Sequence, residues 1–198
     1  MPKEVWLGRL PYPKALDLQY EYAAKALHEG QEYILGCEHP QTITLGKRGG
    51  TLLSSTPRIP VVQTSRGGLA TAHEPGQLLI YPIINIKKRG LAVREWVHGV
   101  RSCVCSWLRS ISIEVDHNSD TGVWVQNHKL VSIGFQIKDG ISHHGLAINV
   151  ENDLRTFDEI VACGIRDVKL TTLRNLGISY TTQETFSGVH TKLREWLK

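Results

Sequence analysis

The sequence has no long apolar run. None of its hydrophobic stretches approaches the roughly 20 residues that a membrane-spanning helix needs. The first residues also lack the apolar core of a signal peptide, and they are not arginine- and serine-rich like a transit peptide. We therefore expect a cytoplasmic protein, in which the four cysteines stay reduced.

Metal and nucleotide motifs are missing as well. The cysteines form no C-x-x-C pair, and Cys103 and Cys105 lie two apart in a helical pattern, so they point to different sides. No Gly-Lys-Ser/Thr follows a glycine-rich segment, which excludes a P-loop, and Gln77 stands where a zinc-protease motif needs its second histidine. The sequence therefore predicts no metal.

Charge of one sign is not in large excess. The chain has 23 Lys and Arg against 19 Asp and Glu, a net charge of +4. This balance is too small to indicate nucleic-acid binding, although it suits an acidic protein partner. With 198 residues, 41% of them hydrophobic, and no repeat or Ser/Pro-rich linker, residues 1–198 are expected to form a single domain.

What is present is a mixture of helical and strand patterns. Apolar residues at intervals of three and four predict helices over 14–29, 91–110 and 182–198, the first following Pro13 and stopping at Gly30. Short apolar runs between turn residues predict strands, with Pro82 as a local break in one ladder. The expected strands are 32–37, 42–45, 60–64, 77–86, 122–125, 129–138 and 143–150.

This order predicts the fold class. The strands cluster between the helices without strict β-α-β alternation, which disfavours a doubly wound sheet. We expect an α/β (α+β) fold with a mixed, mostly antiparallel sheet, flanked by helices that cover one side of it.

The densest candidate for a functional site is the segment 66–77. Two glycines after Arg66 let the backbone approach a ligand closely, and exposed amides in such a turn can bind a carbonyl or phosphate oxygen. His73 lies in the following Pro/Gly-bounded loop. The alternative is a plain turn between strands, with His73 exposed and idle.

Two further segments carry candidate side chains. Lys129 shares a strand face with Val131 and Ile133, so its ammonium either is buried with a partner or reaches water along its stem. His143 and His144 are adjacent on a strand, so only one of them can face a pocket.

Cys163 is the candidate nucleophile. It stands between small residues, Ala162 and Gly164, which leave a sulfur accessible. A thiolate is the reactive form and needs a nearby positive charge that lowers the thiol pKa. The alternative is a buried, inert cysteine, which we expect for the other three.

Taken together, these segments resemble the octanoyltransferase family of lipoate biosynthesis. The resemblance covers most of residues 30–175, with the motifs in the family's order. They are Glu38-His39-Pro40 with Thr44 and Gly46, Arg66-Gly67-Gly68…Thr71-x-His73-x-Pro75-Gly76-Gln77, Gly122-Val123-Trp124-Val125, Lys129…Ser132-Ile133-Gly134, His144-Gly145-Leu146-Ala147…Asn149, Cys163-Gly164 and Thr171-Thr172-Leu173.

The resemblance implies a reaction and a fold. The family moves an octanoyl group from octanoyl-acyl carrier protein to a lysine of a lipoyl domain, through a cysteine thioester, on a biotin/lipoate protein ligase-like fold. Its acceptors are the lipoyl domains of 2-oxoacid dehydrogenase complexes and the glycine cleavage H protein. Because a thioester is already activated, no ATP, cofactor or metal is implied.

The resemblance also assigns residues. Cys163 matches the nucleophile, and Lys129 matches the base that lowers its pKa and shuttles the proton. His73 would orient or polarise the acyl carbonyl, and backbone amides of the binding segments would stabilise the oxyanion. The segments matching substrate-binding stretches are Arg66, Gly67, Gly68, Leu69, Ala70, Thr71, Ala72 and His73, then Ser132, Ile133 and Gly134, then His144, Gly145, Leu146 and Ala147.

Three positions depart from the family pattern. Ala72 stands where a tyrosine is usual, which would remove a ring from the pocket edge. Glu74 puts a carboxylate where glycine is common, and Ala162 replaces a frequent proline. These changes affect the pocket rather than the reaction.

Other classes remain open at this stage. An ATP-dependent lipoate or biotin ligase shares the fold but needs no cysteine nucleophile. A cysteine-dependent amidotransferase that moves octanoyl between lipoyl proteins places its cysteine differently. A non-catalytic binding module would not need both Lys129 and Cys163.

Overall fold

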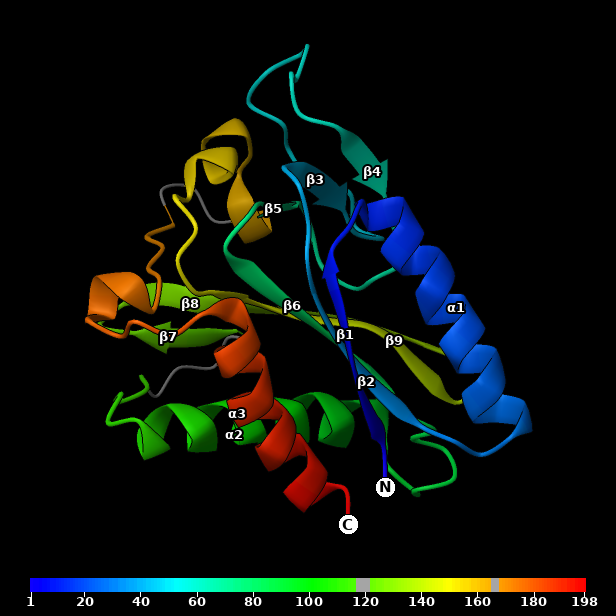
Figure 1. Cartoon of the computed structure of the whole chain (residues 1–198). Helices are drawn as coiled ribbons and strands as arrows, with labels where there is room; N and C mark the ends of the chain where they lie inside the picture. Colours follow the sequence, from blue (N-terminus) through cyan, green and yellow to red (C-terminus); the bar gives the residue numbers. More distant parts are fainter. Residues whose placement is uncertain (117–121, 165–167) are drawn as a thin grey trace.

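A six-stranded sheet, in the order β1-β2-β6-β9-β8-β7, forms the centre of the molecule, and a three-stranded sheet, β4-β3-β5, lies beside one end of it (Figure 1). The computed structural model describes residues 1–116, 122–164 and 168–198, except for the side chain of Cys163. The strands are β1 (Lys3–Arg9), β2 (Tyr33–Glu38), β3 (Thr42–Leu45), β4 (Val61–Gln63), β5 (Thr71–His73), β6 (Gln77–Ile83), β7 (Val123–Val125), β8 (His128–Lys138) and β9 (Ile141–Asn149).

Three α-helices and three short 3₁₀ turns complete the described fold, and one of these turns contains Cys163. They are α1 (Tyr12–His28), α2 (Val93–Ser110), α3 (Thr182–Trp196), and the 3₁₀ turns η1 (Arg155–Glu159), η2 (Ala162–Gly164) and η3 (Arg174–Leu176). All three predicted helices are confirmed. Pro13 lies in the first turn of α1, and Gly30 follows its end with a φ of +73°. None of the described helices is long and apolar enough to cross a membrane.

The pairing of the strands confirms a mixed, mostly antiparallel sheet. β1 pairs with β2, and β3 with β4, in parallel. The remaining ladders between the named strands are antiparallel. Two of them, β7–β8 and β8–β9, are hairpins closed by the two-residue turns 126–127 and 139–140. Both residues of each turn have positive φ, as the twist of a tight hairpin requires.

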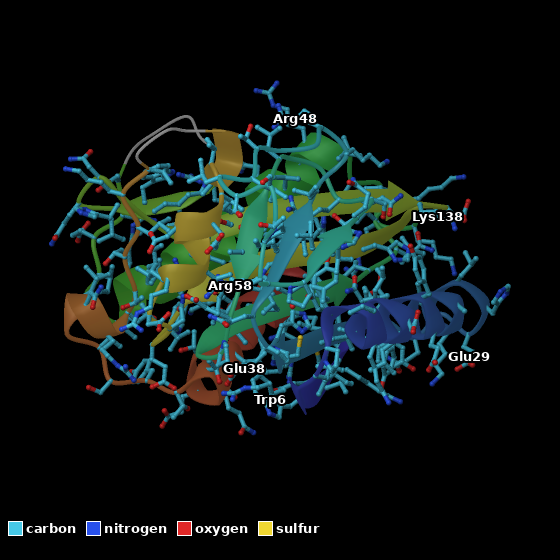
Figure 2. All side chains as sticks on the ribbon, turned by 90° about the horizontal axis from the view of Figure 1, so that it is seen from above. Trp6, Glu29, Glu38, Arg48, Arg58 and Lys138 are labelled. Atoms are coloured by element: carbon cyan, nitrogen blue, oxygen red, sulfur yellow. The ribbon has the colours of Figure 1, made fainter. Side chains whose placement is uncertain are left out.

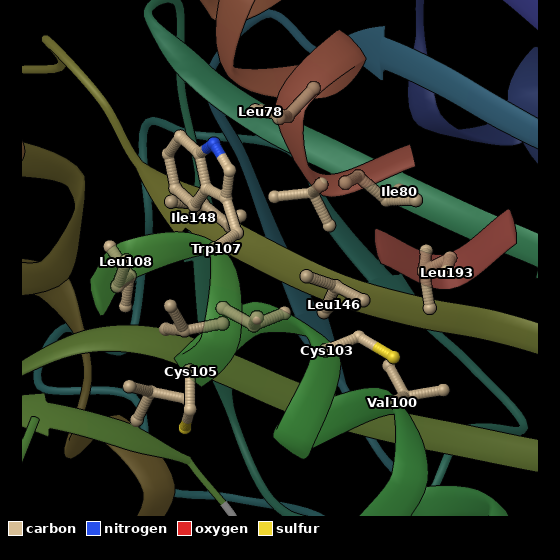
Figure 3. Packing of buried hydrophobic residues seen from close by; sticks show 14 of the residues in the cluster. Leu78, Ile80, Val100, Cys103, Cys105, Trp107, Leu108, Leu146, Ile148 and Leu193 are labelled. Carbon is tan, nitrogen blue, oxygen red and sulfur yellow. The ribbon is translucent and has the colours of Figure 1, made fainter. Parts of the chain in front are cut away.

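Both faces of the central sheet are covered by helices. Ile34 and Ile80 point to the α2/α3 side, whereas Leu35 and Leu79 point to the α1 side. Figure 1 shows α1 on one side and α2 with α3 on the other, and Figure 3 shows the packing beneath α2 and α3. The expectation of helices on one side only is therefore wrong. β2 and β6 read as nearly continuous apolar runs because they are buried on both faces, whereas β9 is equally buried but carries polar residues, among them His143 and His144.

Two glycines set the spacing of α2 and α3. A Cβ on Gly99 would come within 2.0 Å of the Trp196 ring, and one on Gly188 within 2.1 Å of the Trp107 indole nitrogen. Trp196 of α3 therefore packs against Gly99 of α2, and Trp107 of α2 packs against Gly188 of α3. This close approach explains Gly188, which costs a helix interior about 1 kcal/mol relative to alanine.

β1 and β5 were not predicted from the sequence, whereas the irregularity at Pro82 was. His73, expected in a loop, lies in β5, a strand of three residues next to Pro- and Gly-containing turns. β1 is an edge strand whose side chains are mostly half-buried or exposed, so it shows no clear alternation. Pro82 pairs with Ile34 of β2, but the ladder between β6 and β9 ends at Ile80. The break therefore occurs on the β9 side, where Pro82 has no N–H to donate.

Candidate active site

A pocket lies where the loop after β4 packs over β8 and β9, with α1 along one side. It encloses about 700 Å³, including its open mouth. Its wall consists of Tyr12, Arg48, Arg66, Gly67, Gly68, Leu69, Ala70, Thr71, His73, Leu79, Tyr81, Lys129, Ser132, Ile133, Gly134, His144, Gly145, Leu146 and Ala147.

Glycines on adjacent strands make room for this arrangement. Gly134 of β8 and Gly145 of β9 are direct cross-strand partners. A Cβ on Gly134 would lie 3.1 Å from the carbonyl oxygen of Gly67, and one on Gly145 only 1.9 Å from that of Ile80. The Gly67 amide donates to the Phe135 carbonyl at 2.9 Å. That amide is therefore already bonded and is not a free oxyanion donor.

Lys129 lies at the start of β8 in the pocket wall and is only 4% exposed. Its Nζ sits 5.3 Å from the centre of the Trp124 ring, a cation–π distance. A Cβ on Gly122 would approach its Cε to 2.6 Å, so the glycine leaves space for the stem. The alternative of a lysine that reaches water is wrong.

The chain that follows Cys163 pairs with Lys129. The Lys129 amide donates to the Lys169 carbonyl at 2.8 Å, and the Thr171 amide donates to the Lys129 carbonyl at 3.1 Å. Leu170 thereby forms a parallel bridge with Lys129. The backbone on the carboxyl side of the candidate nucleophile is thus tied to the candidate base.

Cys163 itself belongs to η2, but its side chain lies outside what the structure describes. The next residue, Gly164, has a φ of +74°, and a Cβ there would lie 2.4 Å from Cδ1 of Leu69. Because Leu69 lines the pocket, η2 packs against the pocket wall. We call residues 152–164, which lead from β9 to this point, the cysteine arm.

The other three cysteines are free and buried. Burial raises the pKa of the Cys103 thiol to about 12 and also raises the pKa values of Cys37 and Cys105. Such thiols carry almost no thiolate near neutral pH. They are therefore poor nucleophiles.

His73 is buried in a continuous chain of hydrogen bonds. Its Nδ1–H donates to Oε1 of Gln77 at 2.8 Å, and its Nε2 accepts from the Thr44 hydroxyl at 3.3 Å. The Arg66 guanidinium donates to that hydroxyl at 2.9 Å. Gln77 in turn donates to Asn149 at 2.9 Å. Both ring nitrogens are engaged, so His73 orients Arg66 and Gln77 in this state; the reading of an exposed, idle histidine is wrong.

Two tyrosine–histidine pairs lie next to this chain. The Tyr12 hydroxyl donates to Nδ1 of His144 at 3.2 Å, and the Tyr81 hydroxyl donates to Nε2 of His39 at 2.7 Å. The Tyr12 ring also stacks on His73, with centroids 5.6 Å apart. His144 lines the pocket, whereas His143 packs against Tyr20. Only one of the adjacent histidines faces the pocket, as predicted.

Burial keeps these histidines neutral. It lowers the pKa of His39 to about 4 and that of His73 to about 3, where the neighbouring His39 contributes further. It also lowers the pKa of His144 to about 3, with help from the Arg66 charge. The three rings therefore serve as hydrogen-bonding groups rather than as acids near pH 7.

These pKa values predict acid sensitivity. A histidine in the unfolded chain has a pKa near 6.5. Below that pH the unfolded chain binds protons that the folded chain does not bind, so protonation favours unfolding. The contribution of each ring is fully present above about pH 6.5 and declines as pH falls toward 3–4. From pH 7.5 to 5.5, His39, His73 and His144 should together remove about 4 kcal/mol from the free energy of unfolding.

Urea unfolding at both pH values would measure this change. His144→Gln should remove about a third of the part contributed by these three rings, since it removes one of them. A free energy of unfolding that stays constant between pH 7.5 and 5.5 would contradict the buried neutral rings.

The structure brings most of the predicted binding residues together. Of the predicted set, Ala72 alone is absent from the pocket wall among the described side chains. It is buried in a small core with Phe157, Ile160 and Ala162 instead. Its neighbour Thr71 lines the pocket. The Thr71 hydroxyl is buried and has no partner among the described residues, which leaves a donor for a bound group.

Sequence reasoning missed four residues of the pocket wall. Leu79 and Tyr81 point inward from β6, and Tyr12 reaches in from α1. Arg48, on the loop after β3, lines the rim and extends outward from the molecule (Figure 2). Tyr12 and Arg48 lie outside the recognised motifs, so only the three-dimensional packing reveals them.

Glu74, one of the departures from the family pattern, is buried and only 1% exposed. Its carboxylate accepts hydrogen bonds from the Asn152 side chain and from the backbone amides of Leu154 and Thr156. All three donors belong to the cysteine arm. The carboxylate therefore holds the beginning of that arm against the loop after β5.

Comparison with known proteins agrees with this geometry. The family model described as the lipoyl protein ligase A/B catalytic domain matches residues 11–193. The chain therefore belongs to the lipoyl protein ligase A/B catalytic family. An octanoyltransferase of Syntrophobacter fumaroxidans is 36% identical, covering 95% of this chain and 87% of that protein. Within the family, the chain thus falls among the octanoyltransferases.

Solved structures show the same fold at low identity. A lipoate-protein ligase A bound with ATP is 13% identical and superposes with a TM-score of 0.77, covering 100% of this chain and 86% of that one. A biotin protein ligase from Aquifex aeolicus is 14% identical with a TM-score of 0.58, covering 100% and 69%. The expected biotin/lipoate protein ligase-like fold is confirmed.

Proposed function

We propose that this chain transfers an octanoyl group to a lysine of lipoyl domains through a thioester on Cys163, with Lys129 as its basic partner. Octanoyl transfer in protein lipoylation rests on membership of the octanoyltransferases. The thioester and the roles of the two residues are the part we add. Residues 1–198 would act as one catalytic domain.

One observation carries the mechanism. Lys129 is a buried lysine in the wall of the pocket, and its backbone is paired with the chain that follows Cys163. A buried ammonium beside a thiol favours the thiolate, which is the attacking form. The same lysine can then move protons in both half-reactions.

The first half-reaction forms the acyl-enzyme. The Cys163 thiolate attacks the carbonyl carbon of the donor thioester, the new C–S bond forms, and the bond to the donor sulfur breaks. The Lys129 ammonium gives its proton to the departing thiolate and becomes neutral. The donor leaves as a free thiol.

The second half-reaction restores the enzyme. The acceptor lysine amine attacks the acyl-enzyme carbonyl, the C–N bond forms, and the bond to the Cys163 sulfur breaks. Neutral Lys129 takes the proton that the amine loses. The products are an octanoyl amide and the original thiolate–ammonium pair, so atoms and charges balance.

The pocket suits an alkyl chain beside a thioester. Leu79, Ile133 and Leu146 supply apolar wall, while Lys129 and the Thr71 hydroxyl supply polar groups. Transfer of about eight carbons out of water is favourable by roughly 0.8 kcal/mol for each buried CH₂. The pocket can therefore hold the acyl group while the carbonyl faces the catalytic pair.

The proposed reaction has a protein donor and protein acceptors. The donor is octanoyl-acyl carrier protein, and the acceptors are lipoyl domains of 2-oxoacid dehydrogenase complexes and the glycine cleavage H protein. The reaction needs no metal, ATP or other cofactor because the donor thioester is already activated. The proposed compartment is the cytoplasm, where thiols stay reduced, as a thiolate nucleophile requires.

Intact mass spectrometry tests the proposal. The purified chain, mixed with octanoyl-acyl carrier protein and no ATP, is expected to gain one octanoyl group, and peptide mapping should locate it on Cys163. Addition of an apo lipoyl domain should then move the group to that domain. Hydroxylamine at neutral pH should release it from the chain but not from the lipoyl domain, since a thioester is cleaved and an amide is not.

Two results would overturn the proposal. If octanoate and ATP modify the lipoyl domain while octanoyl-acyl carrier protein alone does not, the chain acts as a ligase. If the acyl group reaches the lipoyl domain and no Cys163 adduct is detected even in rapid-quench samples, transfer does not pass through this thioester.

A further inference from the structure

We propose that Glu74 is a positioning residue that sets the place of Cys163 against Lys129, by fixing the start of the cysteine arm. This inference rests on the proposed role of Cys163. Glu74 departs from the family pattern, and its side chain does not line the pocket.

Both carboxylate oxygens of Glu74 accept hydrogen bonds from the cysteine arm. One oxygen accepts from Nδ2 of Asn152 at 2.9 Å and from the amide of Leu154 at 2.7 Å. The other accepts from the amide of Thr156 at 3.1 Å. Because the group is only 1% exposed, water does not compete for these bonds. Hydrogen bonds to a charged, buried acceptor are stronger than neutral ones.

The bonded amides are those that begin η1. Leu154 has a left-handed backbone with a φ of +67°, a conformation that a branched residue rarely adopts without external restraint. The carboxylate bonds the amide of Leu154 and, two residues on, that of Thr156. Glu74 therefore holds the bend at which the chain leaves β9 and turns toward the cysteine.

The rest of the arm is placed by contacts that depend on this bend. The Val161 amide donates to the Thr51 carbonyl at 2.9 Å, and the Leu53 amide donates to the Glu159 carbonyl at 2.8 Å. Phe157 and Ala162 pack on Ala72. Gly164 follows Thr156 by eight positions and meets Leu69 at the pocket wall.

The same carboxylate is connected to the other side of the pocket. Asn152, which donates to Glu74, also donates to Asn149 at 3.3 Å. Asn149 accepts from Gln77, and Gln77 accepts from His73. A continuous buried network thus runs from the Arg66 loop, which lines the pocket, to the start of the cysteine arm. A shift at Glu74 would alter the relative placement of both.

Glu74→Gln is the sharpest test because it changes the group with almost no change in volume. Both carboxylate oxygens of Glu74 accept from N–H donors. In glutamine one of these oxygens becomes an NH₂, which cannot accept, so at least one hydrogen bond is replaced by two donors that face each other. We expect about a tenfold to hundredfold fall in the rate of octanoyl-enzyme formation, since displacements near 1 Å have effects of that size. The concentration of octanoyl-acyl carrier protein that gives half the maximal rate of single-turnover acylation should change less than the rate itself, because Glu74 lies outside the pocket wall and reaches the Arg66 loop only through a chain of hydrogen bonds.

A second readout separates positioning from stability. The pH midpoint of iodoacetamide alkylation at Cys163 should rise toward the value of about 8.5 for a free cysteine, since the proposed pairing of the thiol with Lys129 would be lost. The three buried cysteines react slowly, and intact mass resolves a single adduct. Both measurements are made at a temperature where circular dichroism shows each variant folded.

Glu151→Gln is the matched control. It makes the same chemical change next to Asn152, but Glu151 is half-exposed and pairs with Arg174 at the surface. It should leave the acylation rate and the alkylation midpoint unchanged. If Glu74→Gln does not fold, Asn152→Ala removes one of the three bonds and should still lower the acylation rate, by about threefold to tenfold.

The outcomes distinguish this inference from the proposed function. If Glu74→Gln, or Asn152→Ala in its place, behaves like Glu151→Gln while Cys163 forms the adduct, Glu74 does not position the nucleophile and the proposed function stands. If no adduct forms on Cys163 in the unaltered chain, the proposed function fails first.

Discussion

Cys163→Ser is expected to abolish the octanoyl adduct and to lower octanoyl transfer by at least about a thousandfold. A serine hydroxyl ionises far above neutral pH, so Lys129 cannot hold it as the anion that attacks a thioester. Removal of a catalytic nucleophile costs up to about a millionfold where it has been measured in other enzymes. Single-turnover transfer to an apo lipoyl domain, followed by mass, would measure the loss.

Cys105→Ala is the control for this substitution. Cys105 lies on α2 in the main core, away from the pocket wall, and its buried thiol has a raised pKa. The variant should transfer at the rate of the unaltered chain once folded. Equal transfer by the Cys163→Ser and Cys105→Ala proteins would disprove a cysteine nucleophile.

Lys129→Met should produce the second large effect, a fall in acyl-enzyme formation of at least about a hundredfold, typical for loss of a general acid–base group. Methionine keeps the unbranched stem in the buried site, so the fold is retained while the charge is lost. The alkylation midpoint of Cys163 should move up toward that of an unassisted thiol. Rapid-quench acylation and alkylation across pH 5–9 would measure both.

Two further lysine variants sharpen this result. Lys138→Met alters the other end of the same strand, where an exposed lysine lies 5.7 Å from the Tyr20 ring, and should leave transfer unchanged. Lys129→Arg keeps a permanent charge but cannot release a proton. It should therefore retain a low thiol pKa with slow transfer. If Lys129→Met transfers as fast as Lys138→Met, Lys129 takes no part in the chemistry.

Much of the fold followed from local patterns. The helices have strong apolar periodicity, and β2 and β6 have nearly continuous apolar runs. Each hairpin turn carries residues that accept positive φ. β1 was missed because an edge strand with half-exposed side chains has little pattern to read. The coverage of both sheet faces was missed because it depends on which face of each strand meets which helix.

Some features of the site were also predictable from the sequence, whereas others depend on the folded chain. Short motifs predicted that the segments around Arg66, Lys129 and His144 belong to one site. The residue pattern left open whether Lys129 is buried, and the structure shows that it is. The motifs did not predict that His73 has both ring nitrogens bonded, since Thr44 and Gln77 meet it only in the folded chain. Nor could a motif show that Ala72 faces a small core, which follows from alternation along β5 next to the pocket residues Thr71 and His73.

The bridge between Lys129 and Leu170 has a consequence for how the site can open. Lys129 belongs to β8, which is held on both sides by the ladders to β7 and β9. Leu170 is joined to Lys129 by an isolated bridge with two backbone hydrogen bonds. Local opening is easiest where few bonds hold the chain. Opening of this bridge would therefore release the segment that follows the proposed nucleophile while the central sheet stays intact.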